Sequence, residues 1–193
     1  KETIKVIKDG TIGKLKKMES SFGNELIYKK NFLGFKKIKI DRNKRLFNKD
    51  LGGGVILDQG CYTTSLSLLI ASLVENIDLS NFKINNIQTE YLNSNIDVHS
   101  EANINFDDKF RSYVIASFKD NIGNKTKIEG EDGQIILENS WTSEKSKMQI
   151  SGKINKVLEF NDQKNLYSLE IKYISEDIIS DKKEATFPGT NKK

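Results

Sequence analysis

Apolar and polar residues alternate through most of the second half of the chain, and this pattern predicts a sheet. From residue 82 onward, apolar side chains recur at every second position in seven runs. Short turns such as 107–109 and 132–133 separate neighbouring runs, so adjacent strands should be antiparallel. One earlier strand is expected at 14–22. The seven runs cover residues 82–92, 98–106, 110–118, 125–131, 134–138, 147–153 and 156–160.

Three other segments have apolar residues three and four positions apart, which predicts helices. The first, 2–9, has the pattern of the final turns of a helix that stops at Gly10. The second lies within 52–73 and is expected to break near Gly60. The third covers 165–179 and should turn Leu166, Leu169, Tyr173 and Ile174 inward.

Residues 24–48 follow neither period and are expected to be irregular. The predicted fold is therefore α+β, with a large, mainly antiparallel sheet and two or three helices on one face. We expect one domain over residues 1–189, followed by a polar tail at 190–193. Such a fold by itself says little about function.

Composition narrows the possible chemistry. The chain has 193 residues, 36% hydrophobic and 30% charged, which fits a folded domain with a heavily charged surface. Cys61 is the only cysteine and His99 the only histidine, so we expect no intrachain disulfide, no metal site and a reducing, cytoplasmic location. His99 lies in an alternating run and is expected on the surface of a strand. No apolar run approaches the roughly 20 residues that span a bilayer, so no membrane segment is expected.

Charge is distributed unevenly along the chain. Residues 1–49 contain 15 Lys and Arg against 5 Asp and Glu, a net charge of +10, whereas the remainder carries −6. A basic segment of this kind attracts anionic polymers, so a basic binding module is one alternative function. The lysine pairs lack interleaved aromatic residues, however, and we expect no nucleic-acid partner.

One segment, RLFNKDLGGGVILDQGCY at residues 45–62, resembles a motif of the glucose-fructose oxidoreductase / inositol dehydrogenase / MocA (Gfo/Idh/MocA) family. Residues 7–15 are similar to that family's entry into its C-terminal domain. Residues 128–135, followed by Trp141, are similar to a later hairpin. Within the family, the chain looks most like the dihydrodiol dehydrogenase-like members.

The resemblance implies the substrate-binding domain of an NAD- or NADP-dependent oxidoreductase that acts on a sugar, polyol or related diol. Family members place a Rossmann domain before this one, yet the sequence has no Gly-x-Gly-x-x-Gly motif and no Glu-Lys-Pro motif. The chain is therefore expected to be a fragment or split product that lacks the upstream Rossmann domain. Alone, it should bind neither cofactor and be inactive.

Asp58 and Tyr62 are the catalytic residues that the resemblance implies, with Tyr62 exchanging the substrate proton and Asp58 orienting substrate or base. Their spacing of four would bring both side chains to one face of a helix. Asp58 could equally complement a helix N-terminus and Tyr62 could simply pack by its ring. Gly53 and Gly54 are candidate cofactor-binding residues, although tight packing would also explain them, and Arg45 is a candidate substrate-binding residue or a surface ion-pair partner.

The resemblance also implies a homo-oligomer. Tyr113 and Ile115 alternate with apolar residues of the same run, so the sheet face without helices should be unusually apolar unless a partner covers it. The alternative to an enzyme domain is a non-catalytic scaffold that oligomerises through this open face.

Overall fold

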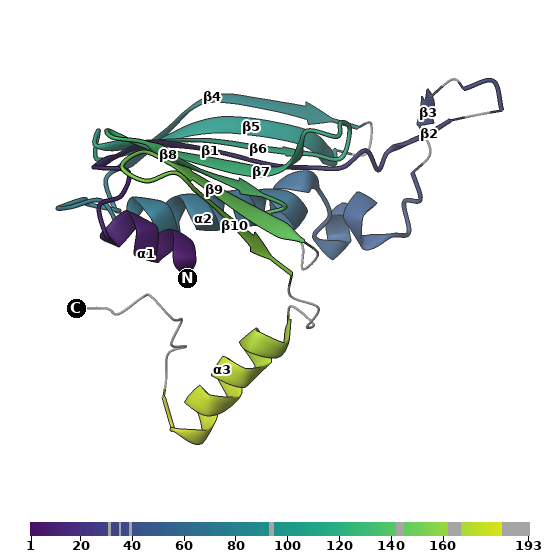
Figure 1. Ribbon diagram of the computed structural model, residues 1–193. Coiled ribbons are helices and arrows are strands. Elements are labelled where there is room, and N and C mark those ends of the chain that lie inside the picture. The colour runs from purple at the N-terminus through teal and green to yellow at the C-terminus, as the bar shows by residue number, and fades with distance from the viewer. Residues whose placement is uncertain are drawn as a thin grey trace.

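A computed structural model of the chain describes residues 1–30, 32–34, 36–38, 40–92, 95–141, 145–161 and 167–182. It consists of one eight-stranded sheet, a small two-stranded sheet and helices that lie mainly on one face of the large sheet (Figure 1). This architecture confirms the α+β prediction. The predicted tail at 190–193 lies outside the described residues.

The large sheet has the strand order β10-β9-β8-β7-β1-β6-β5-β4. All its neighbouring strands are antiparallel except β1 and β6, which are parallel, because β1 is inserted between β7 and β6. The eight predicted strands are confirmed with small shifts at their ends. They are β1 Leu15–Gly23, β4 Phe82–Tyr91, β5 Asp97–Phe106, β6 Phe110–Ser117, β7 Gly123–Gly130, β8 Gln134–Glu138, β9 Ser146–Ser151 and β10 Lys156–Phe160.

The stretch predicted to be irregular is partly ordered. It contains the hairpin of β2 (Tyr28–Lys30) and β3 (Lys36–Ile38), which extends beyond the end of the large sheet (Figure 1). Two short 3₁₀ turns follow, η1 at Arg45–Phe47 and η2 at Lys49–Leu51.

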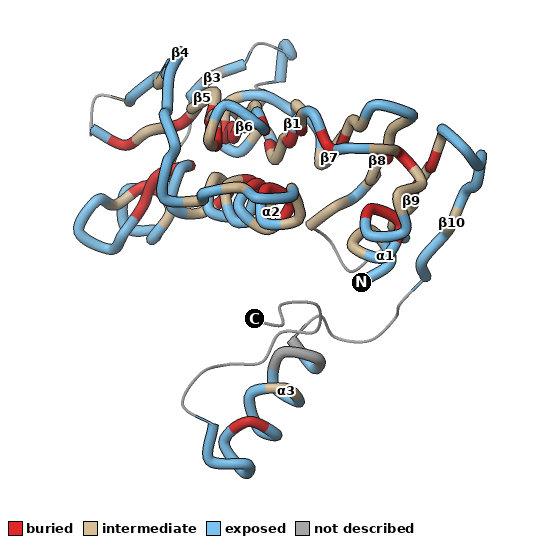
Figure 2. Tube along the Cα trace, turned by 90° about the vertical axis from the view of Figure 1, so that its left-hand side faces the viewer, coloured by how far each residue is buried: buried red, intermediate tan, exposed pale blue. Residues whose placement is uncertain are grey.

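Helices α1 (Glu2–Lys8) and α2 (Cys61–Ala71) cover the same face of the sheet (Figures 1 and 2). A π-helical turn, η3 (Ile56–Gly60), leads directly into α2. The predicted break near Gly60 is therefore wrong. Gly60 has right-handed helical backbone angles, and the hydroxyls of Thr63 and Thr64 donate to its carbonyl oxygen. The π-helical turn therefore continues into the α-helix at Gly60 without a break.

The main core lies between this face and the two helices. Ile70 and Ala71 of α2 pack with Met18, Ile104 and Ile128 of the strands, each at most 5% exposed. A second cluster, which includes Phe47, Val55 and Phe118, fixes the segment before η3 against the far end of β5 and β6. The two clusters hold η3 and the start of α2 close to the sheet.

Helix α3 (Tyr167–Ile179) stands apart from the helix layer (Figures 1 and 2). Lys1 donates to the Tyr173 hydroxyl at 2.8 Å, but Ile174 is 49% exposed. The prediction that Ile174 turns inward is therefore wrong. Leu166 and the Leu169 side chain lie outside what the structure describes.

Candidate functional site

The predicted site residues lie along one continuous segment that runs from η1 through η3 into α2. The glycine turn Gly52–Gly54 connects η2 to η3. Gly53 N and Gly54 N donate to the carbonyl oxygens of Asn48 (2.9 Å) and Leu46 (3.0 Å), which fold the turn back onto the 3₁₀ segment.

The glycines at positions 53 and 54 permit close approaches within the chain itself. A Cβ atom at Gly53 would lie 2.5–2.8 Å from the carbonyl oxygens of Arg45, Leu46 and Asn48. Gly54 has φ +115°, and a Cβ there would overlap the Asp97 carboxylate. That carboxylate accepts a hydrogen bond from Ile56 N at 2.7 Å, at the start of η3. Packing therefore accounts for both glycines, and direct contact with a cofactor stays a prediction.

Asp58 and Arg45 are brought together by this fold. One Arg45 guanidinium nitrogen forms an ion pair with Oδ1 of Asp58, whose side chain is 23% exposed against 54% for Arg45. The structure thus joins two of the residues that the sequence singled out. A substrate oxygen that approaches here would meet both a carboxylate and a guanidinium group.

Tyr62 lies one helical turn after Asp58 and contacts two other aromatic residues. Its ring meets the ring of Phe22 edge-on at 5.6 Å between centroids, and the Trp141 ring at 5.8 Å. Phe22 and Trp141 stack at 6.2 Å. Trp141 Nε1 donates to the carbonyl oxygen of Ser21 at 3.2 Å, which fixes the indole over the end of β1. Tyr62 itself stays 46% exposed, so its ring is held in place while part of it remains accessible.

Gln59 is a positioning residue that the sequence reasoning missed. Its side chain is 3% exposed, and with the amide nitrogen oriented inward it donates to the carbonyl oxygens of Phe22 (3.0 Å) and Ser117 (3.1 Å). These bonds connect η3 to the ends of β1 and β6. The sequence contains no local signal for this role, because glutamine is usually an exposed residue.

The described residues contain no cluster of His, Cys, Asp and Glu that could hold a metal ion. Among the same residues, no helix is both long and apolar enough to cross a membrane.

Residues 1–136 match the family model described as the GFO/IDH/MocA C-terminal domain. The chain belongs to the GFO/IDH/MocA family. This confirms the resemblance seen in the 45–62 motif. A search of curated protein sequences gave no match.

Solved structures agree on the fold. An aldose-aldose oxidoreductase from Caulobacter crescentus, complexed with glycerol, is 16% identical, with a TM-score of 0.71 over 97% of this chain and 52% of that one. KijD10, a 3-ketoreductase from Actinomadura kijaniata in complex with NADP and TDP-benzene, is 14% identical, with a TM-score of 0.69 over 93% of this chain and 50% of that one. This chain therefore spans about half the length of either enzyme.

Proposed function

We propose that the chain is the substrate-binding part of an NAD(P)-dependent oxidoreductase that acts on a sugar, polyol or related diol. The observation that carries this proposal is the placement of Asp58 and Tyr62 on the turn from η3 into α2, beside the Phe22 and Trp141 rings. Membership of an oxidoreductase family and neighbours crystallised with NADP support it.

Each residue has a distinct role in this proposal. Oxidation of an alcohol removes a hydroxyl proton while a nicotinamide cofactor, when bound, takes the hydride. The Tyr62 phenol exchanges that proton, and a tyrosine with an ordinary pKa of about 10 needs a nearby cation to do so at neutral pH. Asp58, held by Arg45, orients the substrate hydroxyl, and the aromatic rings exclude water from one side of the site.

The cofactor is expected to be held by a dinucleotide-binding domain outside these residues. The spaces beside Gly53 and Gly54 are filled by the chain's own carbonyl oxygens and by the Asp97 carboxylate, which would repel a phosphate. These glycines therefore shape the turn that carries Asp58. The isolated chain should be catalytically inactive, and we place the whole enzyme in the cytoplasm.

Joining the chain to a family dinucleotide-binding domain tests the proposal. We expect NAD- or NADP-dependent oxidation of at least one member of a panel of polyols and aldoses, and none by the isolated chain. Turnover by the isolated chain, free of contaminating enzyme, would refute the predicted inactivity. A joined protein that binds NAD(P)H but turns over no member of the panel would favour the scaffold alternative.

We also propose that the domain self-associates through the open face of its sheet. The expected apolar patch is not what the structure has there: Tyr113 and Ile115 are half-buried, and charged residues surround them. The support comes instead from the family resemblance, which implies a homo-oligomer. A sharp monomer mass in sedimentation over a wide concentration range would count against self-association.

A further inference from the structure

The segment between β1 and the glycine turn, residues 24–51, carries more positive charge than the chain as a whole. This basic loop contains nine Lys and Arg against three Asp and Glu, a net charge of +6, whereas the whole chain has a net charge of +4. The loop includes the β2–β3 hairpin and the turns η1 and η2. The proposed function has so far used only one of its cations, Arg45.

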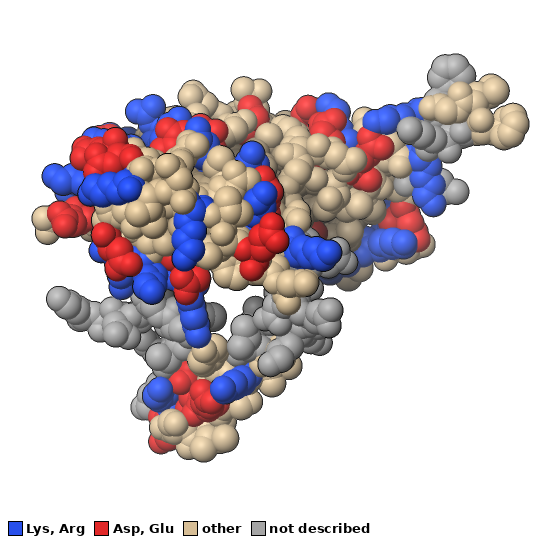
Figure 3. Space-filling model, viewed as in Figure 1, with Lys and Arg blue, Asp and Glu red and all other residues tan. Residues whose placement is uncertain are grey.

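Both ends of the basic loop lie at the candidate site. It begins just after Phe22, whose ring meets the Tyr62 ring at 5.6 Å between centroids. Near its other end, Arg45 pairs with Asp58, and Gly54 N donates to the Leu46 carbonyl oxygen at 3.0 Å. Figure 3 shows Lys and Arg side chains at this end of the molecule, from the hairpin down to the helix layer, together with some acidic ones. The excess positive charge is therefore placed beside the site.

Three cations around η1 and η2 are free to meet a ligand. Arg42, Lys44 and Lys49 are exposed, and none of them forms an ion pair with another described residue. Two acids lie in the same stretch of chain. Asp41 accepts a hydrogen bond from Asn43 N at 3.0 Å, and Asp50 is exposed. Both acids are already included in the net charge of +6.

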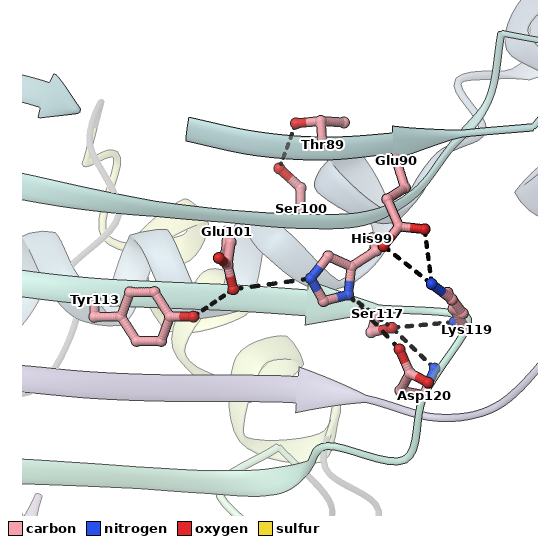
Figure 4. Close-up of polar contacts among 9 residues, drawn as sticks. All are labelled: Thr89, Glu90, His99, Ser100, Glu101, Tyr113, Ser117, Lys119 and Asp120. Atoms are coloured by element: carbon pink, nitrogen blue, oxygen red, sulfur yellow. Dashed lines mark hydrogen bonds and ion pairs between the residues drawn. The ribbon is translucent and has the colours of Figure 1, made fainter. Parts of the chain in front are cut away.

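Other cations at this end of the sheet are matched by acids, as the cluster around His99 illustrates (Figure 4). Lys119 pairs with Glu90 at 2.8 Å, and Asp120, which lies 4.0 Å from Nδ1 of His99, interacts with both Lys119 and Lys36. Lys36, on β3, is thus compensated. With Asp120 and Asp58 also counted against the basic loop, its net charge is still +4.

Resting on the function proposed above, we propose that the ligand of this site is a phosphorylated sugar or polyol, whose phosphate binds Arg42, Lys44 and Lys49 while its reacting hydroxyl lies at Asp58 and Tyr62. A phosphate monoester carries between one and two negative charges at pH 7 and offers three acceptor oxygens. Arginine and lysine side chains donate charge-assisted hydrogen bonds to such oxygens.

The Arg45–Asp58 pair suits a ligand with a neutral end and an anionic end. An unpaired Asp58 carboxylate would repel a phosphate nearby, and its ion pair with Arg45 removes that repulsion from the reacting end. Arg42 and Lys49 are three and four residues from Arg45. Because 3₁₀ turns rise only about 2 Å per residue, their Cα atoms lie within about 10 Å of that of Arg45. Their long side chains can therefore meet a phosphate carried by a sugar bound at Asp58.

Substrate comparison in the protein joined to its dinucleotide-binding domain tests the proposal. The probes are glucose, glucose 6-phosphate and UDP-glucose, with mannitol and mannitol 1-phosphate as the polyol pair. We expect kcat/KM for at least one phosphorylated compound to exceed that for its neutral counterpart on the order of tenfold or more. The advantage should shrink as the ionic strength rises from about 0.05 to 0.3 M, because salt screens exposed charges. The monophosphates and UDP-glucose distinguish a terminal phosphate from a nucleotide-linked diphosphate.

The double variant Arg42→Gln, Lys44→Gln removes two of the proposed phosphate ligands. It should raise KM for the phosphorylated substrate on the order of tenfold and leave kcat/KM for the neutral counterpart unchanged, which a merely structural role would not do. The matched control is Lys8→Gln, Lys83→Gln, which removes two exposed cations from α1 and β4 and should alter neither value.

Binding to the 193-residue chain provides a readout that does not depend on turnover. Titration calorimetry should detect the preferred phosphorylated compound, and its binding should weaken on the order of tenfold in the Arg42→Gln, Lys44→Gln variant. Inorganic phosphate should compete with it, whereas the neutral counterpart should not.

The outcomes separate this proposal from the proposed function. Oxidation of neutral and phosphorylated compounds with equal kcat/KM would overturn the phosphate site and leave the oxidoreductase function standing. Binding of a phosphorylated compound without turnover of any panel member would support the phosphate site and contradict the oxidoreductase function. A double variant that changed KM for NADP and not for the substrate would overturn the proposal, because the cations would then serve the cofactor. A chain that bound a single-stranded oligonucleotide but no phosphorylated sugar or polyol would also overturn it.

Discussion

The two faces of the large sheet carry different kinds of side chain, which are stabilised in different ways. On the helix-covered face, apolar side chains pack under α1 and α2, and this apolar surface continues outward beyond the helices. Phe82, Ile84 and Ile87 of the edge strand β4 are 51%, 49% and 62% exposed. Ile84 and Ile87 line a cavity of about 200 Å³ between η3, α2 and β4–β6. On the open face, polar and charged side chains prevail, and some of them form ion pairs, such as Lys17–Glu129, Lys119–Glu90 and Lys127–Glu129. Val157 on edge strand β10 is an exposed large apolar residue on this face.

This difference shows which face would gain stability from a covering partner. Exposed apolar surface is stabilised only when something covers it, whereas paired charges are already satisfied in water. The candidate site lies on the helix-covered side, at the end of β1. A further domain that supplies cofactor would therefore find both the site and uncovered apolar surface on the same side of the sheet.

Gly54→Ala should produce the largest effect, because the helix-covered site depends on one close approach. The substitution places a Cβ against the Asp97 carboxylate at φ +115° and breaks the bond from Ile56 N. We expect a loss of about 3 kcal/mol or more in the free energy of unfolding, measured by urea denaturation.

Gly52→Ala is the matched control for that variant. Gly52 has φ +69°, but a Cβ there would meet no atom within 4 Å. The loss should be only about 1 kcal/mol, from the left-handed backbone alone. Equal losses in the two variants would show that the contact with Asp97 is unimportant.

Tyr62→Phe should separate chemistry from packing at the site. In the protein joined to its dinucleotide-binding domain, removal of the hydroxyl should lower the rate of hydride transfer on the order of a hundredfold, with little change in melting temperature. Single-turnover kinetics and thermal unfolding measure both quantities. Normal hydride transfer would contradict the proton-transfer role even though the family assignment stands.

Asp58→Asn is expected to act differently. An orienting carboxylate contributes in the ground state and in the transition state, so substrate affinity should fall along with turnover. If Asp58 has only a structural role, the same variant should change the melting temperature through the lost pair with Arg45 and leave affinity unaltered.

Substitution of two buried serines on the helix-covered face should change the free energy of unfolding by smaller amounts. Ser112 is fully buried, and its hydroxyl has no hydrogen-bond partner among the described residues, whereas Ser20 shares a hydrogen bond of 2.8 Å with Thr126. Ser112→Ala should leave the free energy of unfolding unchanged or raise it, while Ser20→Ala should lower it by about 1 kcal/mol. A loss for Ser112→Ala as large as that for Ser20→Ala would indicate a partner for the Ser112 hydroxyl.

Local pattern was enough to predict most of the sheet. Alternation located strands such as β8 and β10 with their observed bounds, because their side chains face a covered side and an open side in turn. It missed β2 and β3, which have three residues each and too few positions to show a period. The parallel pairing of β1 with β6 was also missed. Short turns predict only the pairing of strands that follow one another in the chain, whereas β1 and β6 are far apart in the sequence.

The candidate site was predicted only in part. The motif located Asp58, Tyr62 and Arg45, and the structure adds the Arg45–Asp58 pair that their spacing of 13 residues could not reveal. Phe22 and Trp141 come from β1 and from the segment after β8, so their contact with Tyr62 depends on the fold of the whole sheet. Gln59 and Asp97 act through backbone atoms, for which the sequence carries no local signal.

The smallest expected effect concerns the paired charges of the open face. Lys127, followed by Lys17, holds the pKa of Glu129 below its usual value. A lowered folded-state pKa stabilises the fold above the unfolded-state pKa, and this stabilisation is lost as the pH falls through the folded value. Glu129→Gln should therefore reduce stability at pH 7 by at most about 0.5 kcal/mol, because water screens the pair, and the difference from wild type should vanish in acid.

Urea denaturation at pH 7 and at pH 3 measures this difference, with Glu159→Gln as a control on the same face. Glu159 is exposed on β10 and forms no ion pair among the described residues, so its substitution should change stability little at either pH. If Glu129→Gln destabilised the chain by several kcal/mol, the open face would depend on its charges as strongly as the helix-covered face depends on Gly54. A small, acid-sensitive effect would instead show that these solvent-screened pairs contribute little to the stability of the fold, in contrast to the close approach at Gly54.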